Sequence, residues 1–221
     1  MGRRGKEVNK AIILHTATEL IARNGFEGVS MDAIAAGSEI TKRTLYKYFP
    51  SKMAILLNIF EQNLRAIHEM SVFRVARNLP LADYLKTNLR ELYEYSVAHE
   101  SFMKLFWTLD VDALAAEHLP IAKEHIRVWN SSIGGVSAEY IRRAGPTGWL
   151  AGFAPEEIQN MVSAMNKGIV LQTAKDRNLN MQRIESMRLL YLFQGLLDLA
   201  LRDGFVPPPE FEAFMAAAPE K

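Results

Sequence analysis

Apolar side chains recur every three or four residues through almost the whole chain, and no segment alternates apolar and polar residues as a half-buried strand does. Glycine and proline divide this pattern into about nine segments of helical length. The 221 residues are enough for one large or two modest domains. We therefore expect an all-α protein of about nine helices.

The helical segments change character near Pro50 and Ser51. Three helical segments fit within the first fifty residues, and mostly longer ones follow. We expect a three-helix domain over residues 1–52, which begins with a disordered basic arm over about residues 1–7. A larger helical domain is expected over residues 53–221.

Several classes of protein are excluded by residues and motifs that the sequence lacks. Without cysteine there is no disulfide, no thiolate metal site and no cysteine nucleophile. The thirteen glycines form no GxGxxG or GxxxxGK phosphate loop, and neither a GxSxG elbow nor an HExxH helix is present. Asp110 and Asp112 lie on different faces of a helix and make a poor acid–base pair. We expect neither an enzyme nor a bound cofactor.

The hydrophobicity pattern predicts no membrane span. The longest stretch without a charged residue, Ala144–Pro155, has twelve residues, whereas a spanning helix needs about 20 apolar ones. The basic N-terminus is not followed by an apolar signal region. We expect a cytoplasmic protein with no membrane partner.

The net charge of +1 is divided unevenly along the chain. Residues 1–52 hold nine Lys and Arg against five Asp and Glu, and residues 53–221 hold 17 against 20. This asymmetry favours a polyanionic partner for the N-terminal quarter. The basic arm either adds contacts to that partner or serves only as a solubilising terminus.

The first fifty residues have the size of a helix-turn-helix unit. Ser30 is placed to cap a helix over 31–38, Thr41 to cap one over 42–48, and Ser51 to cap the next. A small core for this unit would be filled by Ile13, Ala17, Leu20, Phe26, Ile34, Ile40, Leu45 and Phe49.

The helix over 42–48 has a distinctive surface. Leu45 and Phe49 lie four residues apart and are expected to face inward. The rest of its surface is basic, hydroxylic and aromatic: Lys42, Arg43, Thr44, Tyr46, Lys47 and Tyr48. Such a face fits a DNA major groove, where it can contact phosphates and base edges together. A merely solvated charged face is the alternative.

Residues 40–52 have the sequence ITKRTLYKYFPSK, and with Ser30, Ile34 and Ala35 this stretch resembles the DNA-binding domain of the TetR family of bacterial transcriptional regulators. The similarity covers about residues 8–55. It implies base contacts from the residues that start the helix, groove-wall and phosphate contacts from those that end it, and backbone contacts from Ser30 and Lys52. The resulting set is Ser30, Thr41, Lys42, Arg43, Thr44, Tyr46, Lys47, Tyr48 and Lys52.

Glu39 departs from the family pattern, in which a glycine usually occupies the turn before the recognition helix. Because an acidic side chain facing DNA would oppose the phosphates, we expect Glu39 to point away or to pair with Lys42 or Arg43.

The resemblance further implies that the larger domain forms a homodimer and binds a small-molecule effector. Two long helices carry broad apolar faces with glycines that allow close approach, and the predicted interface residues are Met161, Ala164, Gly168, Leu171, Tyr191, Gln194 and Gly195. Packing within one subunit is the alternative. A dimer would bind a palindromic DNA operator, with half-sites on one face of the duplex.

An effector site is predicted among the aromatic residues of the middle helices. The candidate residues are Phe102, Phe106, Trp107, His125, Trp129 and Met165, which suit an apolar or aromatic effector, and core packing is the alternative. His118 and His125 are separated by Pro120, so no metal site is expected.

The sequence thus predicts a dimeric transcriptional regulator, most simply a repressor that its effector releases from double-stranded DNA. A helical protein whose N-terminal unit docks another protein is the alternative. The residues over 42–52 argue against docking, because a protein-docking helix normally exposes apolar side chains.

Overall fold

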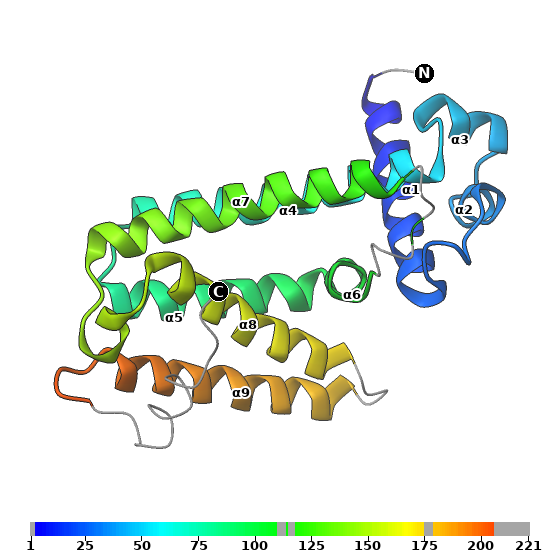
Figure 1. Ribbon diagram of the computed structural model, residues 1–221. Helices are drawn as coiled ribbons and strands as arrows, with labels where there is room; N and C mark the ends of the chain where they lie inside the picture. The colour runs from blue at the N-terminus through cyan, green and yellow to red at the C-terminus, as the bar shows by residue number, and fades with distance from the viewer. Residues whose placement is uncertain (1–2, 110–113, 115–117, 175–178, 206–221) are drawn as a thin grey trace.

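The computed structural model of the chain describes residues 3–109, 114, 118–174 and 179–205. Within these ranges the structure contains helices and no strands (Figure 1), which confirms the all-α prediction. The elements are α1 (Arg3–Asn24), α2 (Met31–Gly37), α3 (Lys42–Tyr48), α4 (Lys52–Ala76), α5 (Leu81–Ala98), α6 (Glu100–Thr108), α7 (Leu119–Ala144), the 3₁₀ helix η1 (Gly148–Gly152), α8 (Pro155–Ala174) and α9 (Leu179–Ala200).

The three predicted N-caps are confirmed. Ser30, Thr41 and Ser51 precede α2, α3 and α4, and each side-chain oxygen accepts a hydrogen bond from the backbone N–H three residues later, at 3.1 Å. These bonds satisfy N–H groups that the first turn of a helix leaves without a partner. Local residue chemistry therefore sets where these helices begin.

Helix α1 begins at Arg3, which differs from the disordered arm expected over residues 1–7. Extending an existing helix by one residue is far easier than nucleating a new one, because each further residue adds a hydrogen bond to a turn that is already formed. The helix therefore continues N-terminally past Gly5, a residue that disfavours helix by about 1 kcal/mol.

Two groups of elements are visible in Figure 1. Helices α1, α2 and α3 gather at one end of the molecule, and α4, α5, α7, α8 and α9 form an elongated bundle. Helices α4 and α7 lie side by side and run in the same direction, with the Ser132 hydroxyl 3.2 Å from Nδ1 of His68. None of the described helices is both long and apolar enough to span a membrane.

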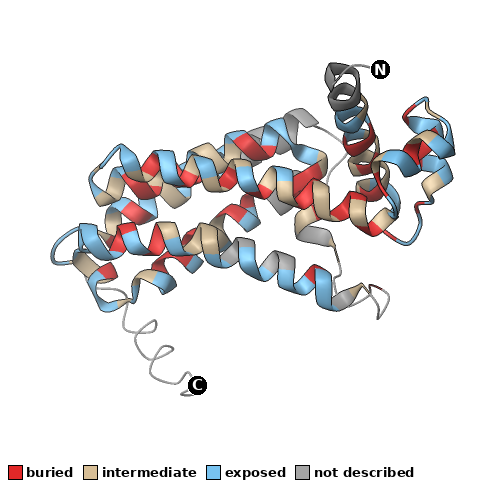
Figure 2. Ribbon diagram, turned by 90° about the horizontal axis from the view of Figure 1, so that it is seen from above, coloured by how far each residue is buried: buried red, intermediate tan, exposed pale blue. Residues whose placement is uncertain are grey.

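The buried side chains form two clusters. Figure 2 colours the buried positions along each helix red. The first runs without a break from α1, α2 and α3 through α4 to α6, and the second fills the bundle between α5, α7, α8 and α9. All eight residues predicted for the N-terminal core belong to the first cluster, with Leu20 and Ile40 only partly buried. The N-terminal unit therefore shares one core with α4 and α6.

Candidate nucleic-acid interface

Two crossed hydrogen bonds close the turn between α2 and α3. The N–H of Ile40 donates to the carbonyl oxygen of Ala35 at 3.0 Å, and the N–H of Glu39 donates to that of Ala36 at 3.1 Å. This pairing is the Schellman motif, in which one residue takes a left-handed conformation. Glu39 is that residue, with a φ of 54°. The turn keeps the conformation that glycine favours although a glutamate occupies it.

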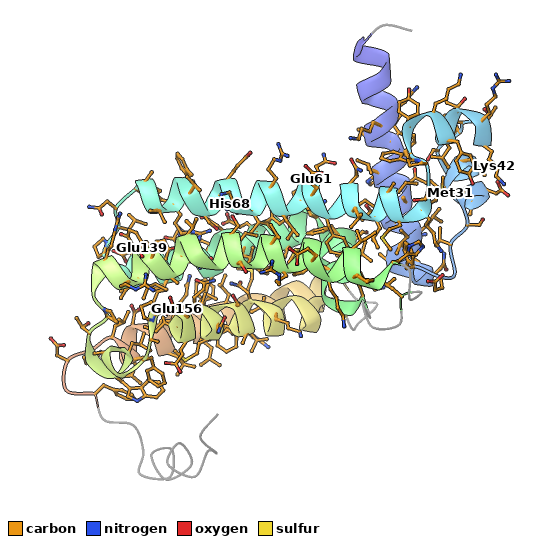
Figure 3. The ribbon with its side chains drawn as sticks, turned by 45° about the horizontal axis from the view of Figure 1, so that its top comes forward. Met31, Lys42, Glu61, His68, Glu139 and Glu156 are labelled. Atoms are coloured by element: carbon orange, nitrogen blue, oxygen red, sulfur yellow. The ribbon has the colours of Figure 1, made fainter. Side chains whose placement is uncertain are left out.

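Helix α3 divides into an inner and an outer face as predicted. Leu45 and Phe49 are 0% and 2% exposed and pack into the first core. Half-buried Thr44 and Tyr48 border them. The exposed residues at the start and on the outer face of α3 are Thr41, Lys42, Arg43, Tyr46 and Lys47. Lys42 projects from the outer edge of the N-terminal unit, away from the bundle (Figure 3).

Lys42 is held by an ion pair with α2. Its Nζ lies 2.8 Å from Oδ1 of Asp32 and donates a hydrogen bond to Oδ2 at 3.0 Å. This bond, with the charge of Asp32, raises the pKa of Lys42 above its ordinary value, so the ammonium stays charged at neutral pH. Lys42 therefore binds Asp32 and not Glu39. Sequence spacing alone does not reveal this pair, because its residues lie on different helices.

Helix α1 supports α3 from behind. Asn9 donates a hydrogen bond from Nδ2 to the hydroxyl of Tyr48 at 3.2 Å. The Nζ atom of Lys10 lies 5.8 Å from the centre of the Phe49 ring. These contacts fix the orientation of α3 on the unit, which lowers the cost of presenting its outer face to a ligand.

Lys52 is directed inward. Its Nζ donates a hydrogen bond to the carbonyl oxygen of Phe26, lies 4.3 Å from the centre of the Phe26 ring and 3.6 Å from Oε2 of Glu27. The side chain therefore ties the start of α4 to the connection between α1 and α2. Its expected contact with DNA phosphate stays a prediction, and these bonds give it a separate structural role.

The predicted dimer residues lie on α8 and α9. Ala164, Gly168, Tyr191 and Gly195 are exposed. Met161 and Gln194 are half-buried, and the side chain of Leu171 lies outside the described part of the structure. A Cβ atom added at Gly168 or Gly195 would meet no described atom within 4 Å.

Three of the predicted effector residues can be placed, and they do not form one group. Phe102 and Phe106 pack in the first core, each with its ring centre 5.9 Å from that of Phe60. Met165 is half-buried against the second core. The side chains of Trp107, His125 and Trp129 lie outside the described residues.

A cavity of about 750 Å³ separates the N-terminal unit from the bundle. It lies between α1, α4 and the corner where α5 meets α6, and Phe102 is among its lining residues. Ser101 on α6 donates a hydrogen bond to Oε1 of Glu19 on α1 at 2.5 Å, beside this cavity. No group of three or more metal-ligating side chains occurs in the part of the chain that the structure describes.

Arg74 was not predicted from the sequence. Only 2% of its side chain is exposed, and Nε donates a hydrogen bond to Oε2 of Glu91 at 2.8 Å. The sequence does carry a signal, because Arg74 continues the spacing of three and four residues that runs through Leu64, Ile67 and Ser71, all buried on α4. A charged residue in a row of buried helix positions indicates a buried charge that needs a polar partner.

A short helix whose basic face is exposed, held by a preceding helix through a four-residue turn, defines the helix-turn-helix class of DNA-binding proteins. Residues 13–59 match the family described as bacterial regulatory proteins, tetR family. The N-terminal domain of the chain is therefore similar to the DNA-binding domain of TetR-family regulators.

Comparison with curated proteins gives the same family. The chain is 32% identical over 104 residues to an HTH-type transcriptional regulator, YuxN, of Bacillus subtilis (strain 168). That match covers 45% of this chain and 34% of YuxN. The chain thus spans only part of the length of such relatives, and the similarity is concentrated at the N-terminus.

Solved structures share the fold over most of the chain. A transcriptional regulator FadR from Bacillus subtilis, in complex with stearoyl-CoA, has a TM-score of 0.65 at 16% identity and covers 89% of this chain and 99% of its own. AibR, in complex with isovaleryl coenzyme A and operator DNA, has a TM-score of 0.62 at 19% identity and covers 85% and 97%. At this identity the likeness concerns the fold alone.

Proposed function

We propose that the protein is a dimeric transcriptional repressor that binds a palindromic operator and leaves it when a small, largely apolar or aromatic effector binds. The observation that carries this proposal is the outer face of α3. It is capped, supported from behind by α1 and lined by Lys42, Arg43 and Lys47, all exposed. The function needs no catalytic step, and such a regulator works in the cytoplasm, where the chromosome lies.

The exposed face of α9 supports the dimer. Tyr191, Leu192 and Leu196 are 64%, 55% and 45% exposed, and Gly195 lies among them. Large apolar side chains gathered on one helix face mark an interaction surface. Gly195 would allow a second copy of the helix to approach closely. Two copies related by a two-fold axis present two α3 helices to one face of the duplex.

The fold relatives support an effector in the regulatory half. FadR was solved with stearoyl-CoA and AibR with isovaleryl coenzyme A, both of which carry an acyl chain. An effector of this kind would shift the helices of the bundle. The shift would reach α3 through α4, which begins at the N-terminal unit, and through the bond between Ser101 and Glu19. Coupling between two such sites is typically about 1–3 kcal/mol.

A selection from random-sequence duplexes tests the proposal. We expect the protein to enrich an inverted repeat and its affinity to fall steeply with salt, because each neutralised phosphate releases counterions. Arg43→Ala should relax the preference at one or two positions of each half-site, whereas Lys47→Ala should weaken binding to all sequences about equally. Enrichment of no sequence, with a flat salt response, would favour a protein-docking unit instead.

A further inference from the structure

A charged group built from three side chains reaches from the surface of the bundle, at Arg77, to its interior, at Arg74. Arg74 and Arg77 both bind one carboxylate, that of Glu91. The Nε atom of Arg74 donates to Oε2 at 2.8 Å, and Nη1 of Arg77 donates to Oε1 at 3.1 Å. Two guanidinium groups on one carboxylate leave one net positive charge at this point. Arg74 is almost fully buried, so solvent screens that charge poorly.

One hydrogen-bond donor of this group and one donor beside it are buried and unused. Nη1 of Arg74 has no hydrogen-bond partner among the described residues, and neither has the hydroxyl of Tyr84, a residue with 0% exposure. The two side chains are in contact, because Cζ of Arg74 lies 5.7 Å from the centre of the Tyr84 ring. Leaving a buried donor without an acceptor destabilises a folded protein, so natural cores contain few such groups.

Helix α8 carries a second set of buried polar atoms that lack hydrogen-bond partners. Asn166 is 1% exposed, and both polar atoms of its amide lack a partner among the residues that the structure places. Oε1 of Gln159, seven residues earlier on the same helix face, also lacks one. Helix α8 packs against α5, which carries Tyr84, and against α7. Three helices therefore contribute buried polar groups that do not bind one another.

We propose that Arg74 and Tyr84 bind the oxygen of an acyl group, either the carboxylate of a free fatty acid or the thioester carbonyl of an acyl-CoA. Nη1–H of Arg74 and O–H of Tyr84 are both donors, so they require an acceptor. The positive charge left by Arg74, Arg77 and Glu91 favours an oxygen that carries negative charge. The neighbouring residues of the second core, Leu85, Leu89 and Val162, offer apolar surface to the hydrocarbon chain.

This inference rests on the proposed effector-responsive function and specifies the ligand chemistry. Arg74, Tyr84 and Asn166 are almost fully buried, so a ligand reaches them only when helices of the bundle separate. A displacement of α5 moves the corner at which α5 meets α6. That corner carries Ser101, which binds Glu19 of the N-terminal unit. Binding of the acyl group would therefore favour one position of the corner between α5 and α6, and binding of the operator would favour another.

The first test compares two tyrosines of α5 without ligand. The hydroxyl of Tyr95 donates a hydrogen bond to Oδ1 of Asn63 at 2.8 Å, and burial raises the pKa of Tyr95 to about 12. Tyr95→Phe should lower the melting temperature by about 2–4 °C. Tyr84→Phe should leave it unchanged or raise it, because no bond is lost. An equal decrease for Tyr84→Phe would mean that this hydroxyl serves the fold, and the proposal would be wrong.

The second test measures ligand binding to the full chain. The probes are carboxylates from butanoate to octadecanoate, the matching primary alcohols and the matching CoA thioesters, with CoA alone as a control. Wild type should be stabilised by at least one chain length of the carboxylate or the thioester, and which of the two binds identifies the source of the acyl group. The alcohol should bind more weakly than the carboxylate, because its oxygen carries no negative charge.

Tyr84→Phe and Arg74→Lys should each weaken that binding by about tenfold or more. The lysine keeps the charge near Glu91 and removes the Nη1 donor. If no probe stabilises wild type, or if the alcohols bind as tightly as the carboxylates and thioesters, the proposal fails. Operator binding without probe is measured in parallel. If the protein binds an operator but none of the acyl probes, only this inference is refuted. If it binds neither an operator nor a probe, the proposed function is refuted.

Discussion

A single side chain, that of Glu39, distinguishes the turn between α2 and α3 from the usual helix-turn-helix pattern. Glu39 holds the left-handed position of the Schellman turn, where a side chain disfavours the conformation and glycine does not. The turn survives because the hydrogen bonds of Glu39 and Ile40 to the end of α2, and the burial of Ile34 and Ala35, fix its geometry. Backbone strain and acidic charge are therefore both present beside the outer face of α3.

Glu39→Gly should raise the free energy of unfolding by about 1 kcal/mol, because it relieves the left-handed strain. Chemical denaturation measures this change. Glu39→Gln is the matched control, since it removes the charge and keeps the strain. It should leave stability nearly unchanged and tighten DNA binding modestly. A destabilised Glu39→Gly variant would contradict the assignment of strain to this position.

In the proposed complex, Asp32 would compete with DNA for Lys42. Asp32→Asn removes the carboxylate that holds Nζ at 2.8 Å. The variant should bind duplex DNA more tightly, by up to about fivefold at low salt, because the lysine no longer has to leave an ion pair. Fluorescence anisotropy at several salt concentrations measures this gain. Asp32→Asn combined with Lys42→Gln should abolish it; a gain that persists would mean that Asp32 acts on DNA directly.

The sequence predicts those side chains whose partners are near in the chain. Ser30, Thr41 and Ser51 were found because a cap bonds to a group three residues away, and Leu45 and Phe49 because helical spacing turns them to one side. The pairs Lys42–Asp32 and Arg74–Glu91 join different helices, and Lys52–Phe26 joins α4 to the connection between α1 and α2. Their formation depends on helix packing, which spacing along the chain does not specify.

If the exposed face of α9 forms the dimer interface, substitutions at Gly195 should change the oligomeric state. Gly195 has no described neighbour within 4 Å of an added Cβ. Gly195→Ala should therefore be tolerated and should favour the helix by about 1 kcal/mol. Gly195→Leu should keep the helical content but shift the protein to monomers, because the longer side chain keeps the partner helix away. Sedimentation velocity and circular dichroism measure both. A dimer that persists in the leucine variant would place the interface elsewhere.

Helices α1 and α6 form a direct connection between the two halves of the chain. Ser101→Ala removes the hydrogen bond to Glu19. We expect operator affinity to fall severalfold and the response to effector to shrink, because α6 no longer positions α1. Ser101→Thr keeps the hydroxyl and should preserve both properties. Titration of DNA with and without ligand measures the two effects, and an unchanged response in the alanine variant would contradict the connection.

In the proposed dimer, the two α3 helices would fix the spacing of the DNA half-sites that they contact. Half-sites must lie on one face of the duplex, one turn or a modest multiple apart. Insertion of about 5 base pairs at the centre of the selected operator turns one half-site to the opposite face, and affinity should fall by tenfold or more. Electrophoretic mobility shifts measure this loss. Equal affinity for both operators would mean that the two copies bind independently.

The unbroken first core limits how this protein can diversify. Residues of α1, α2 and α3 share that core with α4 and α6, so the predicted boundary near residue 52 is not a plane of weak contact. A hybrid that joins residues 1–52 to the body of another regulator would expose the surfaces that α4 and α6 now cover. New operator preferences are therefore easier to acquire by substitution on the outer face of α3 than by exchange of the N-terminal unit between regulators.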